Sequence, residues 1–227
     1  MTLLKTSKTR RAPRTSKAKP KPDPATPPDI VSAINNPQLF QPWFPGPTWD
    51  GWRAVLRAAY ALPMTATEVE FFKSIAGGRE PPTRRVKEIF AATARRSGKD
   101  SMASGIAAWA AAFFNQHHRL RPGERAVVMC LACDRDQAKI VLNYIRSYFE
   151  QIPMLKSMVQ RETASGFELN NGIDITVATN NYRSVRGRPI LLAILDEVSF
   201  FATRIARHLM LRLITRSSPL SPVFLAA

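Results

Sequence analysis

The chain has 227 residues, enough for one sizeable α/β core with a short extension and too few for two full catalytic domains. Its hydrophobic content of 45% and charged content of 22% are ordinary for a soluble protein, and no apolar run approaches the roughly 20 residues that a membrane-spanning helix requires. The 33 Lys and Arg residues outnumber the 17 Asp and Glu residues, which favours polyanionic partners, and two cysteines without a secretory signal indicate a reducing, cytoplasmic compartment.

The N-terminal part of the chain is rich in Pro, Lys, Arg, Ser and Thr. Residues 1–28 contain eight Lys or Arg and one acidic residue, Asp23, so they contribute +7 of the net charge of +16. Such a stretch buries too little apolar area to offset the entropy lost on ordering. We therefore predict a disordered basic arm and linker over residues 1–47, followed by one folded domain over residues 48–227.

Two helices are predicted at the start of this domain. Apolar residues recur at helical spacing from Thr48 to Tyr60. A second, shorter helix follows, because Thr65 and Glu68 form a capping-box pattern and Gly77-Gly78 supplies a stop. Together these helices form a helical lead-in to the rest of the domain.

Strands and helices alternate after the lead-in. Strands are expected at residues 86–93, 126–131, 167–169, 173–177 and 190–195, and helices at residues 102–114 and 134–148. The Asn170-Asn171-Gly172 sequence predicts a hairpin turn, because Asn-Gly adopts positive φ at little cost. The six apolar residues from Ile190 to Leu195 are typical of a strand buried on both faces. This alternation predicts an α/β fold with a mainly parallel sheet flanked by helices.

The segment from Ala94 to Ser101 joins a predicted strand to an Ala-rich helix and has the features of a phosphate-binding loop. Triphosphate binding needs backbone N–H groups at a helix N-terminus, a mobile cation, and a hydroxyl or carboxylate for Mg²⁺. Gly98 lets the backbone approach closely and Lys99 supplies the cation. The candidate nucleotide-binding residues are Ala94, Ser97, Gly98, Lys99, Asp100 and Ser101.

This segment departs from the usual P-loop pattern G-x-x-x-x-G-K-[ST] at two positions. Thr93 stands where the first glycine is expected, and Asp100 stands where the hydroxyl is expected. Either Asp100 holds Mg²⁺ as a carboxylate or Ser101 does so with a shifted register, and we prefer the aligned Asp100. Taken alone, a Gly-Lys pair at a strand-to-helix junction is more often a plain loop than a phosphate site.

A second motif follows the last predicted strand. Asp196 and Glu197 lie where a P-loop ATPase needs one acid that holds Mg²⁺ and another that orients the attacking water. By itself, an acidic pair after an apolar strand is about as often a solvated strand end as a catalytic pair. Together with the first motif it favours a Mg²⁺-dependent ATPase. The separation of 97 positions between Lys99 and Asp196 is typical of the additional-strand type of P-loop NTPase.

Four segments in combination resemble those of a known family. They are the predicted helix from Trp49 to Tyr60, residues Glu68 to Arg79, the arginine-bearing Walker A segment Ala94 to Ser101, and Asn180 to Gly187 ahead of Ile194-Leu195-Asp196-Glu197. From about Trp43 to its end, the chain resembles the large terminase subunits that package DNA into the heads of tailed phages.

The resemblance implies a packaging motor in the cytoplasm of a bacterial host, in which ATP hydrolysis with Mg²⁺ moves double-stranded DNA. It also implies a homo-oligomeric ring on the portal protein, with the small terminase subunit as a further partner. Residues 71–79 are expected near the adenine.

Residue roles follow from the same resemblance. Lys99 is expected to bind phosphate and Asp196 to coordinate Mg²⁺ (the Walker B acid), while Glu197 activates water. Arg95 or Arg96 matches the Walker A arginine that stabilises charge on the γ-phosphate.

Departures from the family leave two alternatives open. No Asp or Glu follows Glu197, whereas a two-metal nuclease needs clustered carboxylates, so the terminase nuclease is not expected in this chain. Residues 221–227 resemble the strand before the family's coupling motif, and we expect a truncated domain that is incomplete at its C-terminus. The alternatives are a helicase-like, DNA-stimulated ATPase, and a non-catalytic DNA-binding remnant of a terminase.

Two further pairs of residues receive structural interpretations. Cys130 and Cys133 form a CxxC sequence, but the sequence offers no second pair of zinc ligands, so small core residues at a strand end are favoured. Trp49 and Trp52 are able to stack on a base, yet their helical spacing favours packing in the core.

Overall fold

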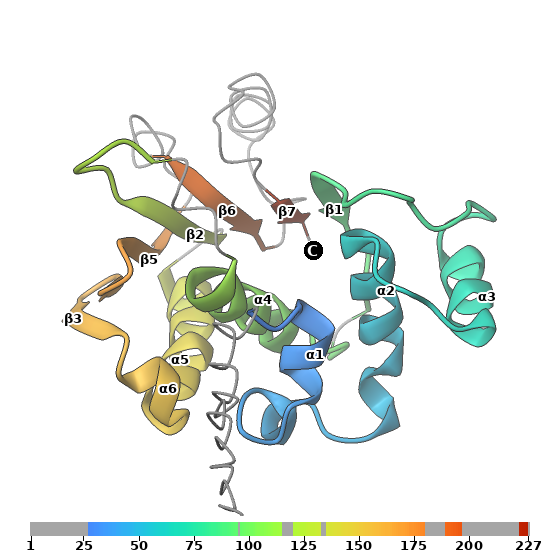
Figure 1. The fold of residues 1–227 in the computed structure, drawn as a ribbon, viewed down its shortest axis with the longest axis horizontal. Helices are drawn as coiled ribbons and strands as arrows, with labels where there is room; N and C mark the ends of the chain where they lie inside the picture. Colours follow the sequence, from blue (N-terminus) through green and yellow to red (C-terminus); the bar gives the residue numbers. More distant parts are fainter. Residues whose placement is uncertain are drawn as a thin grey trace, which may run out of the picture.

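A twisted sheet forms the middle of the protein in the computed structural model (Figure 1). The structure describes residues 27–94, 96–114, 120–132, 135–179, 189–196 and 223–226. Within them, the strands are β1 (Glu88–Phe90), β2 (Ala126–Ala132), β3 (Val159–Thr163), β4 (Gly166–Leu169), β5 (Ile173–Thr179), β6 (Ile190–Leu195) and β7 (Val223–Ala226). Their order in the sheet is β1-β7-β6-β2-β5-β4-β3.

The neighbouring strands β1, β7, β6, β2 and β5 are parallel to one another. At the β5 edge, β4 pairs antiparallel with β5, and β3 pairs antiparallel with β4. β7 lies between β1, which precedes the candidate phosphate loop, and β6, which ends beside Asp196. The strand that ends at Asp196 is thus adjacent to β1 neither in the sequence nor in the sheet. The predicted α/β fold is therefore confirmed.

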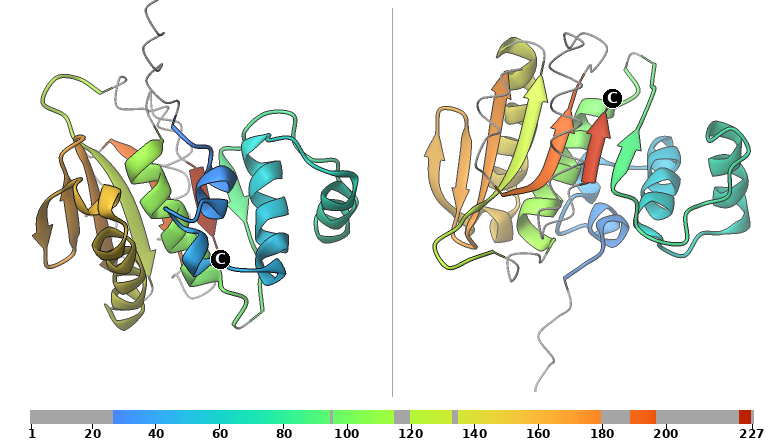
Figure 2. Two further views of the ribbon diagram at one scale, coloured as in Figure 1. Left: turned by 60° about the horizontal axis from the view of Figure 1, so that its bottom comes forward. Right: turned by 90° about the horizontal axis from the view of Figure 1, so that it is seen from above.

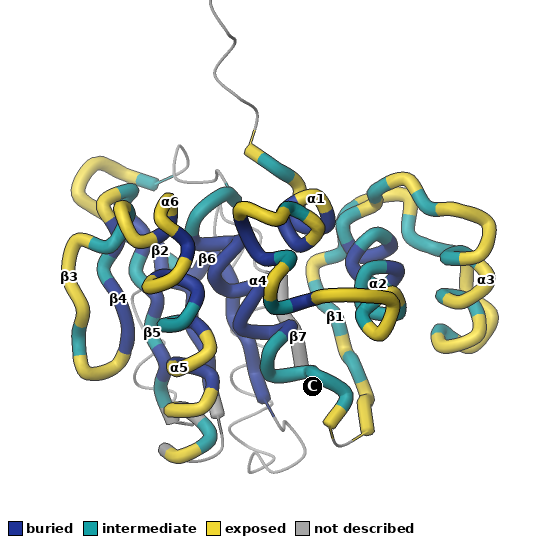
Figure 3. Tube along the Cα trace, turned by 90° about the horizontal axis from the view of Figure 1, so that it is seen from below, coloured by how far each residue is buried: buried dark blue, intermediate teal, exposed yellow. Residues whose placement is uncertain are grey.

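Helices cover one face of the sheet (Figure 2). The helices are α1 (Ile30–Asn35), α2 (Asp50–Tyr60), α3 (Ala66–Ile75), α4 (Lys99–Phe113), α5 (Arg135–Gln151) and α6 (Pro153–Lys156), with short 3-10 turns η1 (Gln41–Trp43) and η2 (Pro47–Trp49). Figure 3 shows that β6 and the middle of α4 are buried, whereas α3 and β3, at opposite ends, are largely exposed. No helix in the described part of the chain has both the length and the apolar character to span a bilayer.

Local signals explain several of these elements. Thr65 and Glu68 form the predicted capping box at the start of α3, with the Glu68 N–H donating to Thr65 and the Thr65 N–H donating to Glu68. Gly172 has a φ of 82° in the predicted turn between β4 and β5. β3 was not predicted, because its Gln160-Arg161-Glu162 stretch is polar and exposed and shows no apolar alternation.

The prediction of a disordered linker over residues 1–47 was wrong for its C-terminal part. Asp29 caps α1 by accepting hydrogen bonds from the backbone N–H groups of Val31 and Ser32. Ile30, Ile34, Phe40 and Phe44 are buried in the core, together with other apolar residues of this segment. An N-cap and an apolar helical face outweigh the Pro-rich composition on which the prediction was based. Residues 1–26 lie outside the described residues.

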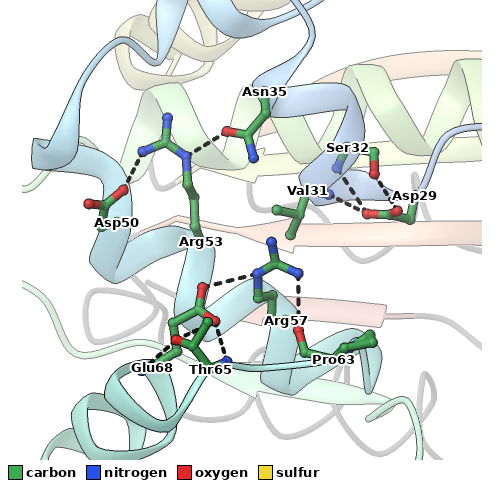
Figure 4. Close-up of polar contacts among 10 residues, drawn as sticks. All are labelled: Asp29, Val31, Ser32, Asn35, Asp50, Arg53, Arg57, Pro63, Thr65 and Glu68. Carbon is green, nitrogen blue, oxygen red and sulfur yellow. Dashed lines mark hydrogen bonds and ion pairs between the residues drawn. The ribbon is translucent and has the colours of Figure 1, made fainter.

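Arginines of α2 join this N-terminal segment to the rest of the domain (Figure 4). Arg53 donates to the Asn35 side chain at 2.8 Å and to the Phe44 carbonyl at 2.7 Å. Arg57, one turn later, forms an ion pair with Glu68 of α3 at 3.0 Å. α2 thus contacts α1 through Arg53 and α3 through Arg57.

Candidate functional site

The loop of residues 94–98 leaves β1 and ends at the first turn of α4. Gly98 is the N-cap of α4 and has a φ of 78°, a left-handed conformation that glycine adopts without steric cost. Arg96 also has a positive φ, 63°, which is uncommon outside glycine and occurs more often where a loop serves a ligand. The helical ladder then begins with the Met102 N–H donating to the Gly98 carbonyl at 2.9 Å.

The Lys99 side chain crosses from α4 to the carboxyl end of β6. Its Nζ lies 2.6 Å from Oδ1 of Asp196 and 4.0 Å from Oδ1 of Asp100. Asp196 is 6% exposed, and its backbone N–H donates to the Leu131 carbonyl at 2.9 Å, continuing the pairing of β6 with β2. A carboxylate buried to this extent requires an opposite charge, which Lys99 supplies. Two motifs 97 residues apart thus meet at the carboxyl ends of parallel strands.

Two serines, Ser97 and Ser101, flank Lys99 in the sequence. The Oγ of Ser97 is buried and, within the described part of the chain, has no hydrogen-bond partner. Ser101 lies in the first turn of α4, where its carbonyl accepts a hydrogen bond from the Tyr148 hydroxyl at 3.1 Å. Burial raises the pKa of Tyr148, so the hydroxyl remains a neutral donor. A buried oxygen without a partner is costly in an apo protein and is explained where a ligand supplies the missing donor or acceptor.

The other predicted site residues surround Lys99 and Asp196 in the sequence. Ala94 and Arg96 are exposed in the loop, and Asp100 lies in the first turn of α4. Arg95 and Glu197 lie outside the described residues. Their predicted roles therefore stay predictions.

Trp49 and Trp52 contact the 94–98 loop, which the sequence analysis did not predict. Both are partly buried against the hydrophobic core, in line with the predicted packing. In addition, the Trp52 indole N–H donates to the Ser97 carbonyl at 3.0 Å, and the Trp49 ring covers Gly98. Nothing in the local sequence signals these contacts, because they join residues 45 or more positions apart.

The segment predicted near the adenine, residues 71–79, covers the second half of α3 and the four residues that follow it. This helix packs on α2 at one end of the molecule (Figure 1), with Phe71 41% and Ile75 55% exposed. A role of this segment in adenine binding stays a prediction.

Cys130 is a buried core residue in β2, as the CxxC interpretation predicted. Burial raises the pKa of its thiol to about 12, so it stays protonated and unreactive near neutral pH. Cys133 lies outside the described residues.

Comparisons with known proteins agree with the fold. The family model described as "Terminase large subunit, ATPase domain" matches residues 69–225. The large terminase of bacteriophage HK97 has a similar structure, with a TM-score of 0.55 at 17% sequence identity over 88% of this chain and 37% of that one. This chain therefore spans little more than a third of the HK97 protein.

A second solved structure is the ATPase domain of the large terminase of Thermus phage P74-26. It matches 76% of this chain and 68% of that domain at 16% identity, with a TM-score of 0.43. No curated protein matches the sequence. Because the family model covers well over half of the chain, this protein belongs to the family of terminase large subunit ATPase domains.

Proposed function

We propose that this chain is the ATP-hydrolysing motor domain of a viral DNA-packaging terminase large subunit. Its function is to couple ATP hydrolysis to the translocation of double-stranded DNA into the procapsid. The observation that supports this most directly is the 2.6 Å ion pair between Lys99 and Asp196, beside the N-terminus of α4. It places a cation, an acid and a helix N-terminus at one point.

The residues at the start of α4 fit a bound triphosphate. The positive end of the helix dipole and the backbone before it favour phosphate oxygens, and Lys99 is the point charge for the β- and γ-phosphates. The buried Oγ of Ser97 is a donor available to a phosphate oxygen. Ala94, Gly98, Asp100 and Ser101 complete the proposed nucleotide site.

Asp196 is the proposed main ligand of Mg²⁺, with Asp100 or Ser101 as a second. Among the described residues, no group of three or more His, Cys, Asp and Glu is arranged around a metal site. Proteins usually hold Mg²⁺ with one or two carboxylates, while substrate phosphates and water supply the other ligands. When bound, the ion would neutralise charge on the transferred phosphoryl group.

Glu197 is the proposed base that orients the attacking water, since it follows Asp196 directly in the sequence. Arg95 or Arg96 is the proposed source of positive charge for the γ-phosphate. These roles rest on the family resemblance and on the position of both segments next to the Lys99–Asp196 pair.

The partners follow from the family. We propose double-stranded DNA as the substrate that is moved, a homo-oligomeric ring as the active assembly, and the portal protein and small terminase subunit as its contacts in the cytoplasm of the host. The net charge of +16 supports a polyanionic partner.

Lys99→Ala tests the nucleotide site. We expect the dissociation constant for MgATP to rise roughly 100-fold, because the substitution removes the charge that faces the phosphates and leaves Asp196 without its partner. Isothermal titration calorimetry measures the affinity. Lys139→Ala is the control, since Lys139 is an exposed lysine of α5 paired with Asp136, and this variant should bind as the wild type does. If the Lys99→Ala variant binds MgATP as tightly as the wild type does, residues 94–101 are not a phosphate-binding loop.

Glu197→Gln tests hydrolysis separately from binding. We expect this variant to bind ATP and lose turnover, measured as phosphate release with and without double-stranded DNA and portal. Unchanged turnover contradicts the role of Glu197. DNA binding that weakens with salt, with no ATP hydrolysis by the wild type, would instead select a non-catalytic DNA-binding remnant. Strand separation would select a helicase-like ATPase.

A further inference from the structure

Two tryptophans, Trp49 and Trp52, contact the loop of residues 94–98, which is the proposed phosphate-binding loop. Trp52, in α2, donates from its indole Nε1–H to the carbonyl oxygen of Ser97 at 3.0 Å. Trp49, at the end of η2, covers Gly98 so closely that a Cβ atom added there would lie 2.5 Å from Cη2 of the indole. Both tryptophans precede residue 69, where the match to the family model begins.

The bond from Trp52 sets the orientation of the peptide that joins Ser97 to Gly98. The C=O and N–H groups of a trans peptide lie in one plane and point in opposite directions. Because the Ser97 carbonyl is held toward Trp52, the N–H of Gly98 is held toward the opposite side of the loop. Backbone N–H groups ahead of a helix N-terminus are the groups that bind phosphate oxygens.

The Trp49 indole is itself held by a buried neighbour, and Trp52 packs against the hydrophobic core. The Trp49 ring packs edge-on against Phe44, with ring centroids 4.8 Å apart. Phe44 is fully buried against α4, where a Cβ atom added to Gly105 would lie 2.9 Å from its Cζ. Arg53 then fixes the backbone of this segment through the carbonyls of Phe44 and Gly46, at 2.7 Å and 2.9 Å. The contact with the loop is therefore made by a rigid part of the molecule.

We propose that Trp52 is a positioning residue for nucleotide binding. Its indole N–H holds the Ser97–Gly98 peptide so that the Gly98 N–H faces the phosphates, while the Trp49 ring restricts Gly98 to its left-handed conformation. The inference rests on the proposed function, because it assigns to the ATP site a support that lies outside the residues matched by the family model.

Trp52→Phe removes the N–H donor and keeps an aromatic ring in α2. We expect the dissociation constant for MgATP to rise about five- to tenfold, the loss that corresponds to one hydrogen bond. We expect KM to rise by the same factor and kcat to change by less than about twofold, because the phosphates are bound in both the ground state and the transition state. Calorimetry and steady-state phosphate release measure the two effects.

Trp109→Phe is the matched control. Trp109 also donates its indole N–H to a backbone carbonyl at 3.0 Å, that of Pro28, but it lies in the last turns of α4, far along the helix from Gly98. Unchanged affinity of the Trp109→Phe variant with weakened affinity of the Trp52→Phe variant supports the proposal. Equal weakening of both, or wild-type affinity of the Trp52→Phe variant, overturns it. A wild-type chain that binds no nucleotide overturns the proposed function itself.

Urea unfolding of each variant verifies that it is folded. Should Trp52→Phe fail to fold, incorporation of 3-benzothienylalanine at position 52 replaces the indole N–H by sulfur with almost no change of shape. The dissociation constant of this variant for MgATP is then compared with that of the wild type. A weakened affinity supports the proposal, and wild-type affinity overturns it.

Discussion

The two helical regions that precede β1 differ sharply in their relation to the candidate site. The segment from Asp29 to Trp52 buries Phe40 and Phe44 and contacts the 94–98 loop through both tryptophans. By contrast, α3 has no buried residue, although it is closer to the loop in the sequence and falls largely within the family match. The contacts that hold the 94–98 loop thus come from the segment that is more distant in the sequence.

The largest expected effect is a loss of folding stability, which should be much greater for a substitution in the first region than for one in α3. Phe44→Ala removes a fully buried ring that packs on Trp49 and Tyr148, and we expect it to lower the free energy of unfolding by about 3–5 kcal/mol. Phe71→Ala in α3 is the matched control, with an expected loss below about 1 kcal/mol, because its ring is 41% exposed. Urea unfolding monitored by circular dichroism measures both. Similar losses would erase the distinction between the regions.

Two glycines with the same backbone angle give a finer comparison. Gly98 and Gly78 both have a φ of 78°, but an added Cβ meets nothing within 4 Å at Gly78 and meets Trp49 at 2.5 Å at Gly98. We expect Gly78→Ala to cost about 1–2 kcal/mol for the left-handed conformation alone. Gly98→Ala should cost about 1–3 kcal/mol more for the overlap with the indole. Thermal unfolding of the two variants checks the difference, and equal costs would mean that Trp49 does not constrain the loop.

The smallest expected effect concerns the N-cap of α1. Burial raises the pKa of Asp29, but the hydrogen bonds from Ser32 and Val31 outweigh this and lower the pKa below its ordinary value of 3.8. Because the folded-state pKa is lowered, the stabilisation is complete well above pH 4 and is lost as the pH falls through the folded-state value. Asp29→Asn keeps the cap but not the charge. At pH 7 we expect this variant to be about 0.5 kcal/mol less stable than the wild type.

Urea unfolding between pH 3 and pH 7 measures this difference, which should shrink toward the acid end. Thr65→Ser, which keeps a hydroxyl cap on α3, is the control and should show no such change with pH. A difference for Asp29→Asn that stays constant over the range would contradict the role of the carboxylate.

Much of the fold could be predicted from the sequence because its strongest signals are local. The apolar run of β6, the Asn-Gly turn before β5 and the capping box of α3 each depend on a few adjacent residues. Residues 29–44 were missed because basic and Pro-rich neighbours concealed a short apolar pattern. β3 was missed because an exposed strand that completes a sheet edge needs no apolar alternation.

The candidate site was predictable to a smaller degree. The motifs around Lys99 and Asp196 predicted a shared site, because parallel strands end at the same edge of a sheet. The bond from Trp52 to Ser97 was not predictable, since it depends on how α2 is placed against α4 and no local pattern encodes that placement. Motifs therefore identify chemical groups, whereas the groups that orient them depend on tertiary packing.

The burial of α4 along most of its length has a consequence for the basic N-terminus. Small side chains let this helix lie deep in the core, and its later turns anchor the chain at Pro28 through Trp109. At 1.5 Å per residue, the eleven positions from Gly98 to Trp109 span about 16 Å. α4 therefore reaches from Gly98 to a contact with Pro28, which ends the stretch that carries eight Lys and Arg residues, so a spectroscopic label at position 28 would report on the environment of the later turns of this helix.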